Sequence, residues 1–180
     1  MRIRTGKGDK GFTSLLFKGH VSKDSPFIKA VGNLDELNSQ LGLIKAKVRS
    51  RGEKDLLERI QRAVYVISSE IAIGTEEKRK HGTILKKADA DWAESVVYEL
   101  EGKVKLKNYF YTPGENELSA LIDIARTVAR RAERSVVGLF KKEKLKNEYI
   151  LSYLNCISDI LFILARKSGQ KKRAKKRKAK

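Results

Sequence analysis

The sequence predicts an all-α protein, a bundle of five helices preceded by a glycine-rich N-terminal arm. Apolar residues recur at helical spacing from about residue 29 to 168. The 180 residues include only two prolines, Pro26 and Pro113, so little interrupts a helix. Alternation of apolar and polar residues, which would indicate strands, is absent except near residues 12–17. We therefore expect one helical domain over residues 1–168.

The individual elements follow from the apolar stripes and from the residues that stop them. Residues 1–27 are expected to be irregular, because glycines are dense there and Pro26 closes the segment. Gly52 and Gly74 end the first two helices, and Asp89 or Asp91 caps the third. The expected helices cover residues 29–49, 53–74, 89–102, 117–142 and 147–168. Such a bundle is of the four-helix (ferritin-like) type with one extra helix.

Composition limits what the protein can do. Cys156 is the only cysteine and there are two histidines, which excludes a disulfide framework and makes histidine-based catalytic or zinc sites poor candidates. The residues that would hold a metal ion cannot be assigned. No run of about 18 apolar residues and no signal peptide are present, so we expect a cytoplasmic protein without a membrane span.

The positive charge is concentrated at the C-terminus. Of the net charge of +18, eight positive charges lie in the last ten residues, "KKRAKKRKAK". Residues 169–180 are therefore expected to form a disordered basic tail. The tail either binds nucleic acid or another polyanion weakly, or only keeps the protein in solution.

The stretch "RTGKGDKGFTSLL", residues 4–16, is too glycine-rich to build a core. Glycines allow backbone N–H groups to approach an anion closely, and lysines add positive charge. The spacing is not that of a Walker A loop, because no strand precedes it and no helix opens on Gly-Lys-Ser/Thr. The segment is either an anion-binding arm or a flexible extension.

Charged residues on the predicted helices border the apolar stripes. Arg126, Arg130 and Glu133 share one face of the fourth helix, which suits either an oligophosphate or an ordinary salt-bridged flank. On the fifth helix Asn155 and Asp159 share a face with Arg166; they either bind a ligand or pair with that arginine. On the first helix, Asp35 is a candidate partner for an arginine elsewhere.

Four stretches, taken together, resemble the signature blocks of the PduO-type ATP:cob(I)alamin adenosyltransferases. They are "TGKGDKGFTSLL", "VGNLDELNSQLGL", "ARTVARRAERSVV" and "YLNCISDILFILAR", in the family's order and spacing from residue 3 to about 166. The resemblance implies transfer of the 5′-deoxyadenosyl group of ATP to the cobalt of cob(I)alamin, which releases triphosphate and forms adenosylcobalamin. It implies ATP with Mg²⁺ and cob(I)alamin or cob(II)alamin as substrates. It also implies a homotrimer with sites between subunits, a reductase, and an adenosylcobalamin-dependent enzyme as recipient.

The resemblance also implies roles for individual residues. Arg130 would contact the triphosphate, Arg126 would pair with Asp35 of a neighbouring subunit, and Phe110 would cover the lower face of the corrin. Glu133 would order the site and Asn155 would contact the nucleotide. The expected contacts of the arm with phosphate and nucleotide are Thr5, Gly6, Gly8, Asp9, Lys10, Gly11 and Thr13. The chain departs from the family pattern at Arg4, Lys7 and Cys156.

A basic helical protein that binds nucleic acid is the alternative function. It predicts aromatic residues interleaved on a basic face. The six Tyr and six Phe instead fall mostly at helical core positions or in residues 109–111. A kinase or ATPase, and a purely structural trimer, are further alternatives.

Overall fold

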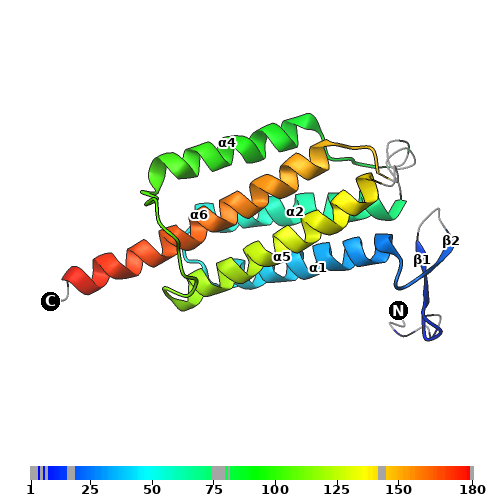
Figure 1. Ribbon diagram of the computed structural model, residues 1–180, viewed down its shortest axis with the longest axis horizontal. Helices are drawn as coiled ribbons and strands as arrows, with labels where there is room; N and C mark the ends of the chain where they lie inside the picture. The colour runs from blue at the N-terminus through cyan, green and yellow to red at the C-terminus, as the bar shows by residue number, and fades with distance from the viewer. Residues whose placement is uncertain are drawn as a thin grey trace.

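The computed structural model describes residues 4, 6, 8–15, 19–73, 80, 82–141 and 145–178, with side chains up to residue 170. It confirms the predicted all-α bundle, to which a two-stranded hairpin is added (Figure 1). The elements are β1 (Phe12–Leu15), β2 (Gly19–Ser22), α1 (Pro26–Lys47), α2 (Arg51–Ile73), α4 (Lys87–Lys103), α5 (Glu117–Phe140) and α6 (Tyr149–Lys178).

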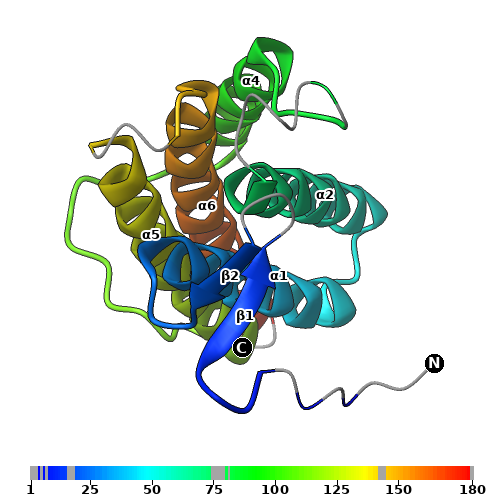
Figure 2. The same cartoon turned by 90° about the vertical axis from the view of Figure 1, so that its right-hand side faces the viewer.

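The helices pack in an order that differs from their order along the chain. α1 lies between α2 and α5, α5 packs against α6, and α6 in turn carries α4 on its outer side (Figure 2). The apolar stripes predicted from the sequence meet inside this bundle. Leu34, Leu41, Ile60 and Leu161 are fully buried, as are Ala129 and Ala132 on the predicted stripe of α5.

Local capping sets the helix starts: α5 begins at Glu117 as predicted, whereas α1 and α4 begin three and two residues before the predicted positions. The Ser25 side chain accepts a hydrogen bond from the Ile28 amide, with Pro26 in the first turn, so α1 begins before the predicted residue 29. The sequence predicted Asp89 as a candidate for the residue that precedes and caps α4, but Lys86 holds that position. Asp89 lies in the first turn and accepts a hydrogen bond of 2.9 Å from the Lys86 amide.

The hairpin accounts for the weak alternation near residues 12–17. β1 and β2 pair antiparallel, with Thr13 opposite Val21. β2 falls in the segment expected to be irregular, and that expectation is wrong. The two strands are short and bury only Leu15, so the alternation of apolar and polar residues that would predict them is weak.

α6 is longer than the sequence predicted. It runs through Lys178, past the expected end near residue 168. Because no side chain beyond residue 170 is described, the assignment of residues 169–180 as a separate tail stays a prediction. Residues Tyr149–Gln170 are long and apolar enough to cross a membrane, but most of that stretch is buried inside the bundle, as in the core helix of a soluble protein.

A buried carboxylate joins three parts of the fold at the end of the bundle where α2 stops. Glu70 is fully buried and accepts hydrogen bonds from the Leu85 amide at 3.2 Å and from Asn147 Nδ2 at 3.1 Å. Asn147 Nδ2 also donates to the Leu85 carbonyl. One side chain therefore holds the segments that enter α4 and α6 against α2.

Replacing Glu70 by alanine is expected to destabilise the protein by about 2–4 kcal/mol, because two buried donors lose their acceptor. Urea unfolding measures this loss. Glu58→Ala is the matched control, since the ion pairs of Glu58, with Arg62 on the same helix and with Lys45 of α1, lie at the surface. Equal stability of the two variants would contradict the role given to Glu70.

Candidate functional site

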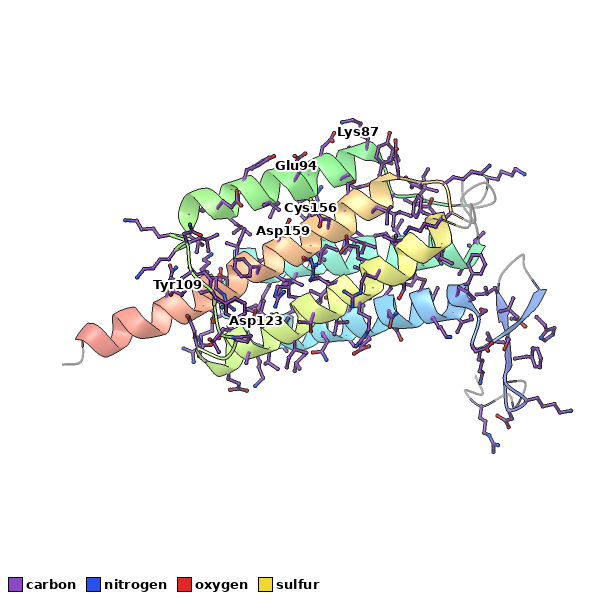
Figure 3. All side chains as sticks on the ribbon, viewed as in Figure 1. Lys87, Glu94, Tyr109, Asp123, Cys156 and Asp159 are labelled. Atoms are coloured by element: carbon purple, nitrogen blue, oxygen red, sulfur yellow. The ribbon has the colours of Figure 1, made fainter. Side chains whose placement is uncertain are left out.

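Arg130 lies in the middle of α5 with its side chain exposed. No ion pair to it is formed within the described residues, but its charge acts on Asp159 of α6. Partial desolvation raises the pKa of the Asp159 carboxyl, the Arg130 guanidinium opposes that effect, and Glu101 of α4 adds to it. Asp159 lies midway along the bundle (Figure 3). The centre of the α5–α6 surface therefore presents a guanidinium that is free to meet an anion.

Arg126 lies one turn before Arg130 and is half-buried. Its Nε lies 3.4 Å from Oδ1 of Asp123, one turn earlier on the same helix. Asp123 is buried, and its other oxygen pairs with Arg166 of α6. The interpretation that Asp159 pairs with Arg166 is therefore wrong. Sequence reasoning missed Asp123, although an aspartate three residues before Arg126, inside the apolar run "LIDIA", was a usable signal.

The other expected residues on α1, α5 and α6 lie at the surface or close to it. Asp35 is exposed, and no described residue forms an ion pair with it. Asn155 is exposed on α6, and Glu133 is half-buried on α5. Cys156 is half-buried, and burial, with Asp159 nearby, raises the pKa of its thiol. A thiol that stays protonated at neutral pH is a poor nucleophile, which agrees with assigning Cys156 no catalytic role.

The glycine-rich arm is described at Gly6, at residues 8–15 and at Arg4, whereas Thr5 and Lys7 lie outside the described residues. It folds into two successive turns, in which the Asp9 amide donates to the Gly6 carbonyl and the Gly11 amide to the Gly8 carbonyl. Gly6 and Gly11 have φ of 70° and 79°, which favours glycine at both positions.

The charged groups of the arm are open to solvent. Lys10 and Asp9 are exposed, Thr13 is half-buried, and Arg4 pairs with Asp9 at 3.3 Å. The arm lies at the end of the bundle where α1 begins, and it does not lie along α5 or α6 (Figures 1 and 2). The described part of the arm therefore leaves its lysine and aspartate side chains accessible to a ligand.

Phe110 lies in the loop of residues 104–116 between α4 and α5, and it is 91% exposed. Its neighbour Tyr109 is also exposed, whereas Tyr111 turns inward, and its ring lies tilted against the Tyr109 ring with 4.5 Å between their centres. An uncovered phenylalanine next to an anchored tyrosine suits the apolar face of a flat ligand. This loop lies at the end of the bundle opposite the arm (Figure 1).

The expected site residues are therefore brought together only in part. Arg126, Arg130 and Asp159 gather on the α5–α6 surface, while the arm and the loop that carries Phe110 lie at opposite ends of the bundle. A ligand that touches both ends needs a second copy of the chain or a different position of the arm. The described residues contain no group of three or more His, Cys, Asp or Glu side chains able to hold a metal ion. A Mg²⁺ ion bound mainly by phosphates and water needs few protein ligands.

Comparisons with known proteins all point to one family. A family profile described as cobalamin adenosyltransferase matches residues 3–168. The corrinoid adenosyltransferase of Bacillus subtilis is 36% identical over 170 residues, covering 92% of this chain and 86% of the relative. The corrinoid adenosyltransferase PduO of Salmonella typhimurium is 34% identical over 166 residues, which cover 92% of this chain. The chain spans about half (49%) of that relative's length.

Solved structures show the same likeness in three dimensions. A variant of the PduO-type ATP:corrinoid adenosyltransferase from Lactobacillus reuteri, complexed with cobalamin and ATP, superposes with a TM-score of 0.85 at 30% identity. That match covers 94% of this chain and 91% of the other. A second variant of that enzyme, complexed with ATP, gives a TM-score of 0.83 at 29% identity, covering 93% and 94%.

Proposed function

The chain belongs to the cobalamin adenosyltransferase family, and on that basis we propose that it transfers the 5′-deoxyadenosyl group of ATP to the cobalt of cob(I)alamin. The observation that carries the proposal is the match, over 94% of the chain, to a relative complexed with both cobalamin and ATP. Four sequence blocks spread from residue 3 to 166 agree with it.

The reaction needs little chemistry from the protein. The electron pair of Co(I) forms the Co–C5′ bond, while the C5′–O bond breaks and its pair leaves with triphosphate. The cobalt substrate is itself the nucleophile, so the protein's task is to position the reactants and to stabilise the leaving group. Arg130, Lys10 and the arm amides would balance the charge of the triphosphate. Mg²⁺ bound to the phosphates would supply further positive charge.

Phe110 has a separate task in this proposal. Cob(II)alamin is hard to reduce while a lower axial ligand donates electrons to the cobalt. An exposed phenylalanine ring could replace that ligand with an apolar face. The 91% exposure of Phe110 supports this role, because the ring is open to a ligand before any substrate binds.

We also propose a cytoplasmic homotrimer with active sites between subunits. Two observations support it: the arm and the loop of Phe110 lie at opposite ends of the same bundle, and Asp35 is exposed without a described ion-pair partner. In this arrangement Arg126 pairs with Asp35 of a neighbouring subunit in addition to its own Asp123. A reductase would supply Co(I), and an adenosylcobalamin-dependent enzyme would take the product.

Replacing Asp35 by asparagine keeps the shape of the side chain but removes the charge. We expect this change to weaken assembly of the trimer. At protein concentrations where the variant trimer dissociates, activity should fall by about tenfold or more. Sedimentation velocity measures assembly, and the adenosylation assay measures activity. Asp91→Asn is the matched control, because the ion pair that Asp91 forms among the described residues is with Lys87 on the same helix. An intact, fully active trimer in the Asp35 variant would count against the pairing.

The direct test of the function is anaerobic. Purified protein, MgATP and chemically reduced cob(I)alamin are mixed, and the loss of Co(I) absorbance is followed together with phosphate analysis. One adenosylcobalamin and one triphosphate per turnover would support the proposal, whereas ADP would indicate another ATP-dependent enzyme. ATP binding without adenosylation would refute it. Absence of ATP binding, with salt-dependent nucleic-acid binding that survives deletion of residues 171–180, would favour the nucleic-acid alternative.

A further inference from the structure

The loop of residues 104–116, which presents Phe110, is fastened to α6 near residues 168–170. Nδ2 of Asn116 donates a hydrogen bond of 3.0 Å to the Ser168 carbonyl. Nε2 of Gln170 donates one of 2.9 Å to the Lys105 carbonyl, at the other end of the loop. α6 therefore holds both ends of the loop.

A helical glycine makes the close approach feasible. A Cβ atom built on Gly169 would lie 3.2 Å from Cβ of Glu115 and would overlap the carboxyl end of that side chain. A larger residue at this position would displace the carboxyl end of Glu115 and would crowd its Cβ atom. The small size of Gly169 therefore lets the Glu115 side chain lie against α6.

Arg166 lies beneath the middle of the loop. Its side chain is only 1% exposed, and its guanidinium lies 5.1 Å from the Tyr111 ring and 5.3 Å from the Phe162 ring. These two rings meet edge to face at 5.7 Å. Tyr111 directly follows Phe110, so the buried cation contacts the residue next to the exposed ring.

The same guanidinium is connected to the α5 surface. Arg166 pairs with one carboxylate oxygen of Asp123, and the other oxygen lies 3.4 Å from Nε of Arg126. Its own Nε has no hydrogen-bond partner among the described residues. A buried guanidinium that is not fully satisfied is a costly way to stabilise a core, since apolar side chains of similar volume often do so as well or better.

We propose that Arg166 is a positioning residue, which through Tyr111 and Asp123 fixes the loop carrying Phe110 relative to Arg126 and the neighbouring Arg130. Arg166 is buried under the loop and its role is to hold groups that meet the substrates. The inference rests on the proposed function, because it explains how the corrinoid-facing and phosphate-facing groups are held in one geometry.

The test uses Arg166→Met, which keeps the length of the side chain and removes the charge. Lys167→Met is the matched control, because it breaks an ion pair between α6 and Glu53 of α2 without touching the loop. Amide hydrogen exchange of the ligand-free protein reports on the loop. The absorption and electron paramagnetic resonance spectra of cob(II)alamin, with MgATP bound, report on removal of the lower axial ligand.

For Arg166→Met we expect exchange of residues 105–112 to be about tenfold faster, with exchange in α1 and α2 unchanged. The spectral signature of cob(II)alamin without its lower ligand should fall to the level of a Phe110→Ala variant, while the Kd for MgATP changes by less than about threefold. Lys167→Met should behave as the wild type in all three measurements. Wild-type loop exchange, or an equal loss of ATP and corrinoid binding, would overturn the proposal.

A second variant covers the case in which Arg166→Met does not fold. Tyr111→Leu keeps the pair of Arg166 with Asp123 but removes the ring over the guanidinium, and it should show the same loop and spectral changes. Arg166→Lys should restore part of the spectral signature, since it keeps the charge. If the wild-type protein binds no corrinoid, the proposed function fails. Loop exchange in the variants then still decides whether Arg166 holds the loop.

Discussion

Replacing Arg130 by alanine is expected to lower the rate of adenosylation by about 10²–10³-fold, because one charged donor to the leaving triphosphate is lost. The proposed reaction uses no protein nucleophile or general base, so no such group can compensate for the lost guanidinium. The decay of Co(I) absorbance in the presence of MgATP measures the rate. Arg130→Lys should fall between the two proteins, since a lysine keeps the charge but not the two-pronged geometry of a guanidinium.

The structure indicates that this loss will not come from unfolding. Arg130 is exposed and forms no ion pair among the described residues, so alanine at this position removes no packing and leaves no buried group unpaired. The melting temperature should therefore stay near that of the wild type. Arg134→Ala is the control, because Arg134 is an exposed arginine one turn further along α5. Full activity of Arg130→Ala, or equal loss in both variants, would contradict the role of Arg130.

Much of the fold could be predicted from the sequence, because a helix that packs on one face has apolar residues at helical spacing. The stripe through Leu34, Leu37 and Leu41 is buried as predicted. Features that depend on a few hydrogen bonds were not readable. The start of α1 depends on Ser25 acting as a cap, and β2 has almost no buried face to mark it.

The candidate site shows a similar limit. Spacing places Asn155, Asp159 and Arg166 on one face of α6, yet only Arg166 is buried. Helical periodicity gives the direction of a side chain but not which neighbour covers it. Here the loop of residues 104–116 covers α6 around residues 162–170, and that contact joins residues more than fifty positions apart, as between Asn116 and Ser168. The pair of Asp123 with Arg166 could be found only once the helices were placed.

Replacing Phe110 by alanine is expected to slow the reaction that starts from cob(II)alamin and a reductant by about tenfold or more. The corresponding shift in the one-electron potential of the cobalt is about 59 mV per tenfold change in the equilibrium constant for reduction. The reaction that starts from pre-reduced cob(I)alamin should change much less, because the lower ligand no longer has to be displaced. Parallel assays from the two oxidation states, with the same protein and MgATP, measure the difference.

The exposure of Phe110 makes this comparison informative. A ring that is 91% exposed contributes little to the core, so the variant should keep the wild-type melting temperature. Tyr65→Ala is the control, since Tyr65 is a 71% exposed aromatic residue on α2, away from the loop. An equal loss from both oxidation states would mean that Phe110 only binds the corrinoid. A selective loss from cob(II)alamin would mean that the ring acts on the coordination of the metal, because binding alone does not distinguish the two starting states.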